Sequence, residues 1–285
     1  MKEIIMSLET GAMERWRQGV PWGWTEISAE EITYIDPGLT KPKEGLEAYK
    51  KYLKQFEGKI NYQLSEFIDP DIRPYGDLAV LTYNYRDDYR DPETEEEDSI
   101  SENPLWNTTQ VYGLKGSEWK IIHTHWSYVK QKLPISTEVP VPVEMSEKEF
   151  KGVLGEVMVL ESSAMERWRK GDPWGFTEIS APEVTYFDTG TPKRLDGLEA
   201  LKAEYAKRVG KIHYDVMDFI DPKVQVHGDA AVLFYRFFST HLNPDGSIAS
   251  RIPWNCTEVF AKKDRKWKIV HTHWSYINGE KGGGK

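Results

Sequence analysis

Two pairs of histidines, one near the end of each half of the chain, could bind a metal ion. His123 and His125 are separated by one residue, as are His271 and His273. Residues i and i+2 of a strand share one face, so each pair would present two imidazoles side by side. A structural zinc site needs four ligands, however, and the spacing offers no third one. We therefore expect packed or hydrogen-bonded histidines, and neither a metal nor a cofactor.

Two aspartates are the second candidates for chemistry. Asp36 and Asp188 each end a short predicted strand, nine residues before a glycine that opens a helix (Gly45 and Gly197). Burial beside an aromatic pocket would raise the pKa of such a carboxylate and suit it to act as a general base. The simpler alternative is a carboxylate that caps the turn beginning at Pro37. The sequence leaves both roles open.

These candidates occur in pairs because the chain is a duplication. Residues 12–17 recur at 164–169, and the closing block 119–128 recurs at 267–276. The offsets of 152 and 148 residues are far longer than the period of a solenoid repeat, about 20 to 50 residues. The chain therefore holds two copies of one domain. We expect a first domain at 1–130, a proline-containing linker at 131–149, a second domain at 150–278 and a disordered tail at 279–285.

Composition restricts the class of protein. The 285 residues suit two domains that each bury a core without disulfides. The net charge of −9 and the lack of a basic stripe argue against a nucleic-acid partner. The single cysteine, Cys256, excludes an internal disulfide and fits a reducing compartment. No apolar run could cross a membrane, and Glu3 and Glu9 stand where a signal peptide needs apolar residues. We expect a cytoplasmic protein.

The order of elements is the same in both copies. Each copy opens with an amphipathic helix, in which Ile5, Ala12 and Trp16 follow helical spacing in the first copy. A short strand and a second helix come next, and strands fill the rest. Helices followed by a run of strands indicate an α+β arrangement. We expect two tandem cone-shaped α+β rolls, each with N-terminal helices packed in a curved antiparallel sheet.

These segments together resemble a known family. A helix that ends at Trp-x-x-Gly (16–19), the run Thr-Tyr-Ile-Asp-Pro (33–37) and the terminal Trp-Lys-Ile-Ile-His-Thr-His strand (119–125) are similar to the nuclear transport factor 2-like superfamily. The closest likeness is to SnoaL-like proteins and to the association domain of calcium/calmodulin-dependent kinase II. The resemblance implies a conical pocket inside a curved sheet, and pairing through the outer face of that sheet. It implies little about function, because isomerases, dehydratases, hydrolases and assembly domains share the fold.

The resemblance also suggests roles for particular residues. It places Trp126 and Trp274 inside the pockets and the histidine pairs on the outer faces. Asp36 and Asp188 match the position of the general base of ketosteroid isomerase, a member of the superfamily. The tyrosine of that enzyme's oxyanion hole is missing, since Ala12 stands there in the first copy, and much of the rate enhancement would be missing with it.

The pockets of the two copies are expected to differ. An arginine that lines the pocket of association domains matches Gln110 in the first copy and Glu258 in the second, so the cationic carboxylate clamp is absent. An amide in one copy and an acid in the other imply that the pockets prefer different ligands or that one is vestigial. The expected pocket residues are Tyr83, Trp106, Gln110, Trp126, Tyr235, Trp254, Glu258 and Trp274.

Three functions fit these observations. The leading one is a binding protein for a small, partly apolar molecule, with an aromatic-lined conical pocket in each copy. The second is a cofactor-independent isomerase, cyclase or dehydratase with Asp36 or Asp188 as general base. The third is an association module without a ligand. In every case we expect the two copies to pair with each other through the histidine-bearing faces, because fusion gives the second copy a high effective concentration. A further homo-oligomer is compatible with this arrangement.

Overall fold

The computed structural model of the chain describes residues 1–88, 105–129, 131 and 151–277. It consists of two compact units: residues 1–37 and 41–130 form unit 1, and residues 38–40 and 131–285 form unit 2. The expected linker at 131–149 lies almost wholly outside the described residues, as does the expected tail at 279–285.

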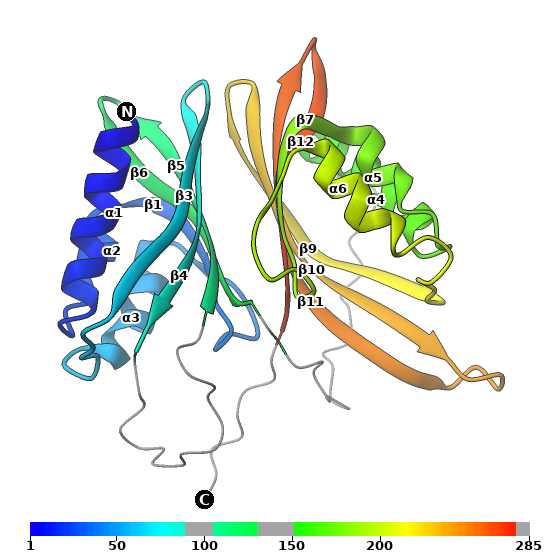
Figure 1. Cartoon of the computed structure of the whole chain (residues 1–285), viewed down its shortest axis with the longest axis horizontal. Helices are drawn as coiled ribbons and strands as arrows, with labels where there is room; N and C mark the ends of the chain where they lie inside the picture. The colour runs from blue at the N-terminus through cyan, green and yellow to red at the C-terminus, as the bar shows by residue number, and fades with distance from the viewer. Residues whose placement is uncertain (89–104, 130, 132–150, 278–285) are drawn as a thin grey trace, which may run out of the picture. The chain divides into compact units, whose positions relative to one another are not determined.

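Unit 1 is an α+β roll built on one six-stranded sheet (Figure 1). The strand order is β2-β1-β6-β5-β4-β3. We expected an antiparallel sheet, but β1 pairs with β6 in parallel, which a crossover rather than a hairpin permits. The elements are α1 (Lys2–Trp16), α2 (Trp22–Glu26), β1 (Ser28–Ile35), β2 (Lys43–Glu44), α3 (Leu46–Leu53), η1 (Lys54–Phe56), β3 (Ser65–Tyr75), β4 (Leu78–Asp87), β5 (Leu105–Lys115) and β6 (Glu118–Tyr128).

Unit 2 repeats this order of elements and the same topology. Its strands follow the order β8-β7-β12-β11-β10-β9, again with one parallel pairing, between β7 and β12. Its elements are α4 (Gly152–Trp168), α5 (Trp174–Ile179), β7 (Ser180–Phe187), β8 (Leu195–Asp196), α6 (Leu198–Ala206), β9 (Val216–His227), β10 (Ala230–Leu242), β11 (Ile248–Lys263) and β12 (Lys266–Tyr276).

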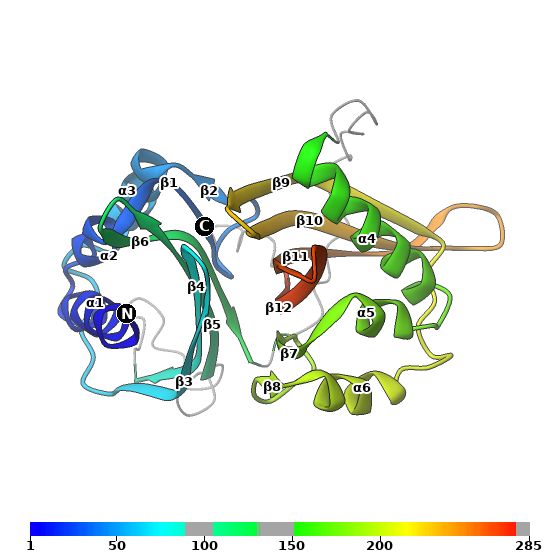
Figure 2. The ribbon, with the colours of Figure 1, turned by 90° about the horizontal axis from the view of Figure 1, so that it is seen from above.

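In each unit the helices cover one face of a curved sheet (Figure 2). In unit 1 the first helix packs tightly on the second because Gly23 has no side chain: an added Cβ would lie 3.1 Å from the Cα of Ala12. Gly175 and Ala164 repeat this contact in unit 2. The first helix ends near Gly19, whose φ of +78° favours glycine. These contacts set the helix at a fixed distance from the strands that it faces.

The edge strands β3 and β9 each contain a bulge. Asp69 has a positive φ of 49°, and the register of β3 against β4 shifts between Ile68 and Asp71. In unit 2 Asp221 has a φ of 50° at the matching position. A proline follows each aspartate, at positions 70 and 222. The duplication has therefore kept the irregularity of the edge as well as the regular sheet.

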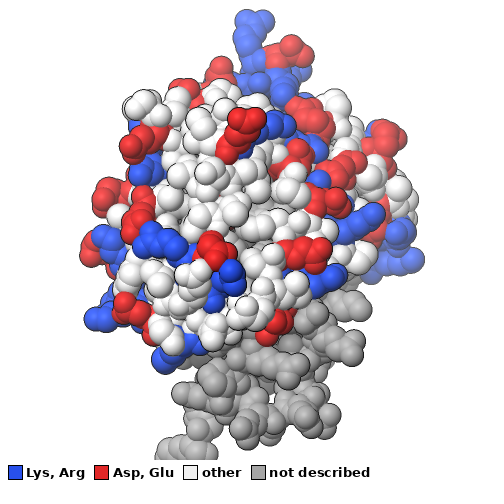
Figure 3. Space-filling model, turned by 60° about the vertical axis from the view of Figure 1, so that its left-hand side comes forward, with Lys and Arg blue, Asp and Glu red and all other residues white. Residues whose placement is uncertain are grey.

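The described helices and the surface agree with two properties of the sequence, its lack of a long apolar run and its many charged residues. No described helix is both long and apolar enough to span a membrane. On the face drawn in Figure 3, acidic and basic side chains are interspersed around a region of uncharged residues.

Candidate functional site

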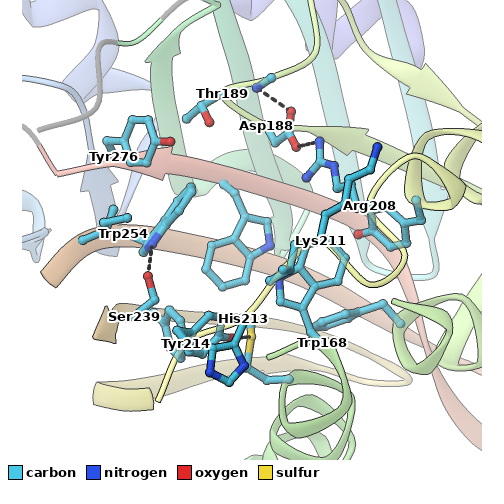
Figure 4. Close-up of a pocket in the computed structure, with 18 of the residues that line it drawn as sticks. Trp168, Asp188, Thr189, Arg208, Lys211, His213, Tyr214, Ser239, Trp254 and Tyr276 are labelled. Atoms are coloured by element: carbon cyan, nitrogen blue, oxygen red, sulfur yellow. Dashed lines mark hydrogen bonds and ion pairs between the residues drawn. The ribbon is translucent and has the colours of Figure 1, made fainter. Parts of the chain in front are cut away.

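Unit 2 contains a cavity of about 450 Å³. This volume lies within the range of small-molecule sites, about 300 to 1,000 Å³. The lining comes from all three helices of the unit, from β7 and β10 to β12, and from the segment that follows α6. Figure 4 shows these side chains converging from the helices and the sheet. The cavity therefore lies between the helices and the sheet of a single unit.

Aromatic side chains of neighbouring strands form one wall of the cavity. The rings of Trp254 and Trp274 meet edge to face, with centroids 6.0 Å apart. Tyr276 lies 4.4 Å from Trp254, measured between ring centroids. The indole Nε1 of Trp254 donates a hydrogen bond of 3.2 Å to Oγ of Ser239, which fixes the ring (Figure 4). Such rigid aromatic faces suit a flat apolar ligand.

An ion pair makes another part of the cavity wall charged, in contrast to the aromatic part. Nη2 of Arg208 lies 2.6 Å from Oδ2 of Asp188, as Figure 4 shows. The same oxygen accepts a hydrogen bond of 2.8 Å from the Tyr186 hydroxyl, and Oδ1 accepts one of 2.8 Å from the backbone N–H of Gly190. The guanidinium of Arg208 also lies over the ring of Trp168, 5.8 Å from its centroid. Asp188 thus holds a cation on the wall of the cavity.

Further basic groups line the same cavity. Lys211 makes no ion pair within the described residues, and His213 lies 3.4 Å from Asp215. Arg208 and Lys211 against Asp188 give the lining residues one net positive charge, although Glu204, outside the lining, also lies 3.4 Å from Nη2 of Arg208; the chain as a whole has a net charge of −9. An anionic group of a ligand would be favoured there.

Unit 1 arranges the matching positions differently. The Tyr52 hydroxyl donates a hydrogen bond of 2.6 Å to Oδ2 of Asp36, the counterpart of Asp188. Phe56 occupies the position that matches Arg208, 152 residues earlier. Its ring lies 5.4 Å from that of Trp16. An aromatic ring therefore replaces the cation, and the matching aspartate is bonded to a neutral phenol.

The expected pocket residues fall into two groups. Trp254 and Trp274 line the cavity of unit 2, as does Asp188, the candidate general base. In unit 1 Trp106 and Trp126 meet at 6.0 Å between centroids, as their counterparts do. The others lie deeper: Tyr83 and Gln110 bond to Glu9, while Tyr235 bonds to Glu161 and Glu258 lies beside it.

Sequence reasoning missed the buried carboxylate of Glu9. Its Oε2 accepts a hydrogen bond of 2.5 Å from Tyr112, and its Oε1 accepts bonds from Tyr83 and, at 3.2 Å, from Gln110. Burial raises the pKa of Glu9 to about 7, although the three hydrogen bonds lower it. Two features of the sequence could have indicated this burial. Glu9 follows Ile5 by four residues, on the apolar face of the helix, and it recurs as Glu161 in the second copy.

Arg208 and Lys211 were also missed. Lys211 belongs to a repeated run, Gly-Lys-Ile (58–60 and 210–212), and Arg208 stands where the first copy has Phe56, but neither signal indicates a cavity; only the folded chain brings the two residues to it.

Comparison with known proteins matches each unit to a family model. Residues 23–131 match the model of the SnoaL-like domain, and residues 155–278 match that of the calcium/calmodulin dependent protein kinase II association domain. The chain belongs to the nuclear transport factor 2-like superfamily. It is a tandem member, with two α+β rolls of the expected kind.

Solved structures of this superfamily resemble single units. A presumed ketosteroid isomerase from Parabacteroides distasonis is 34% identical over 45% of this chain and 89% of its own, with a TM-score of 0.38. A presumed association domain from Xanthomonas campestris is 19% identical, covering 50% and 98%, with a TM-score of 0.40. A nuclear transport factor 2-like protein of unknown function from Pseudomonas putida is 22% identical, covering 50% and 93%, with a TM-score of 0.37. Comparison with curated proteins gives no match.

Proposed function

We propose that unit 2 binds a small molecule that has a flat apolar body and one anionic group. The observation that carries this proposal is the cavity of about 450 Å³. Its lining combines aromatic rings with Arg208, whose guanidinium forms an ion pair with Asp188. The apolar body would lie against Trp254 and Trp274, where removal of apolar surface from water provides the binding energy. The anionic group would lie toward Arg208 and Lys211, whose charges would set its orientation.

Contacts of Asp188 favour binding over base catalysis. Three donors, one of them a guanidinium, already occupy its two oxygens. A general base needs a lone pair directed at the proton that it removes. The isomerase, cyclase or dehydratase alternative would therefore require this network to rearrange when substrate binds. In unit 1 the Tyr52 hydroxyl donates to Oδ2 of Asp36, so that bond would have to break before this oxygen could act as a base.

We also propose that the two units pair with each other through the histidine-bearing faces of their sheets. His123 and His271 each bond through Nδ1 to a threonine of the neighbouring parallel strand, Thr33 and Thr185, at 2.5 and 2.7 Å. These bonds orient the imidazoles on the face of the sheet that alternation places opposite Trp126 and Trp274. We propose that this polar face is an association surface within the chain. Resistance of the four imidazoles to diethyl pyrocarbonate in the folded whole chain would support it; modification at the rate of exposed histidines would refute it.

Two ligands of the same shape test the binding proposal. Calorimetric titration of the whole chain should show that 2-naphthoate binds and that the uncharged 2-naphthalenemethanol binds about tenfold to a hundredfold more weakly, the usual effect of a bond to a charged group. Trp254→Ala should weaken binding of both ligands, and Trp106→Ala, its counterpart in unit 1, should leave both unchanged.

Two outcomes would contradict the proposal. If neither naphthalene derivative binds at millimolar concentration, the cavity is not a site for flat apolar ligands. If binding survives in Trp254→Ala but is lost in Trp106→Ala, the site lies in unit 1.

A further inference from the structure

A second group of side chains in unit 2 is unrelated to the charged wall of the cavity. Glu161 on α4 faces Cys256 and Glu258 on β11, and all three are fully buried. One ligand atom from each residue lies within 4.8 Å of the other two. Cys256 and Glu258 are two residues apart on a strand, so both point to the helix-covered face on which Glu161 lies.

The hydrogen bonds within this group leave two oxygens without a partner. Oε1 of Glu161 accepts a bond of 2.5 Å from Tyr235, and Oε1 of Glu258 accepts one of 3.4 Å from Thr272. The Oε2 atoms of both glutamates are buried and find no hydrogen-bond partner among the described residues. Burial raises the pKa of both carboxyl groups. Two adjoining carboxylates in such a place require a shared proton or a cation.

Unit 1 provides an internal control for this arrangement. At the matching positions it has Glu9, Thr108 and Gln110. There the carboxyl group of Glu9 accepts bonds from the Gln110 amide and from the hydroxyl of Tyr112, so each of its oxygens has a donor. Unit 1 therefore combines one acid with neutral donors to it, Gln110 and Tyr112, while Oγ1 of Thr108 is buried and has no hydrogen-bond partner among the described residues.

In unit 2 three of these neutral groups have changed together. Glu258 replaces the amide, Cys256 replaces the threonine hydroxyl, and Phe260 replaces the phenol of Tyr112. The first change removes a donor and adds a carboxylate, the second adds a thiol, and the third removes another donor. A shared proton would account for the two carboxyl groups but not for the added thiol, whereas metal binding uses all three.

We propose that Glu161, Cys256 and Glu258 form a binding site for a divalent cation of the zinc type, with three protein ligands and the fourth position left to water, unlike a structural zinc site. A borderline-soft ion accepts both thiolate and carboxylate ligands, unlike magnesium or calcium. Ligand bonds of about 2.0 to 2.3 Å place the atoms of a tetrahedral site roughly 3.5 Å apart, so the glutamates need only a small rotation inward. Tyr235, bonded to Glu161, would orient that ligand from outside the site.

The site adjoins the cavity without being part of its lining. Met165, one helical turn after Glu161, lines the cavity, as does Trp274, which pairs with Cys256 across the sheet. Displacement of these two side chains would open a path for the ion.

Cobalt(II) is the probe for this site, because thiolate coordination gives an intense near-ultraviolet charge-transfer band. The chain has one cysteine, so any such band must come from Cys256. Titration of the reduced whole chain should give the band at one cobalt per chain, and zinc should abolish it by displacement. Glu258→Gln and Cys256→Thr, which restore the residues of unit 1, should lower zinc affinity by about a hundredfold or more.

The outcomes separate the metal from a shared proton. Absence of the band in the unaltered chain, with a melting temperature that zinc leaves unchanged, overturns the metal site in favour of the proton. Zinc binding that persists unchanged in Cys256→Thr also overturns it and points to a site elsewhere. If Glu258→Gln fails to fold, Cys256→Thr decides alone, because it removes the soft ligand without changing any carboxyl group.

Discussion

The two units differ most where their shared scaffold meets the cavity. Both place an aspartate at the end of the first long strand and a pair of edge-to-face tryptophans on the sheet. In unit 1 the aspartate accepts a hydrogen bond from Tyr52, whereas in unit 2 it forms an ion pair with Arg208. Duplication has thus kept the residues that shape the interior and changed those that set its charge.

A second difference lies deeper, under the first helix of each unit. Unit 1 surrounds Glu9 with hydrogen-bond donors, and unit 2 faces Glu161 with a second acid and a thiol. Each difference can be removed or exchanged by substitution, because the other unit supplies the replacement residue.

The largest expected effect concerns the pH dependence of unit 1. The folded-state pKa of Glu9 is about 7, against 4.5 as the ordinary value. The folded state therefore holds a proton that the unfolded chain releases, so this stabilisation is complete below pH 4.5 and is lost as the pH rises to about 7. The shift corresponds to about 3 kcal/mol. Hydrogen exchange of α1 amides between pH 4.5 and pH 7.5 should show this loss in the unaltered chain.

Glu9→Gln keeps the shape of the side chain and removes the titrating group. We expect the pH dependence of α1 stability to become nearly flat in this variant. Glu3→Gln, at an exposed position of the same helix, is the matched control and should keep the slope. An unchanged slope in Glu9→Gln would show that another group binds the proton.

An exchange of the cavity cation should have an intermediate effect. Arg208→Phe gives unit 2 the residue that unit 1 has at position 56, and should remove most of the preference for 2-naphthoate over 2-naphthalenemethanol, about tenfold or more. Phe56→Arg should leave binding by unit 2 unchanged. Calorimetry with both ligands measures the preference directly. A preference that survives Arg208→Phe would assign the anion to Lys211 instead.

The smallest expected effect is that of Asp188→Asn. The change keeps the shape of the side chain and removes a negative charge next to the proposed anion, so affinity for 2-naphthoate should rise by less than about tenfold. Titration calorimetry of this variant beside the unaltered chain provides the test. A fall in affinity would mean that Asp188 serves mainly to position Arg208.

The sequence predicted the duplicated α+β architecture because long repeats and strand alternation depend on local spacing. Alternation along the strand predicted the face on which Gln110 and Glu258 lie, but not how deeply they are buried. Both lie beneath the first helix of their unit, Gln110 beside Glu9 and Glu258 beside Glu161. Glu9 was missed because an acid on a helix normally faces solvent. The parallel pairing of β1 with β6 was missed because contacts between distant segments leave no local pattern.

The bulges of β3 and β9 determine how copies of this chain can meet. A positive φ at Asp69 or Asp221, followed by a proline, twists the outermost strand and removes an N–H that a neighbouring strand would require. An edge of this kind resists addition of further strands, a common origin of uncontrolled aggregation. Growth of either sheet into a continuous ribbon is therefore disfavoured at this edge. Contacts through the faces of the sheets or through the helices are limited in number and allow an assembly to close.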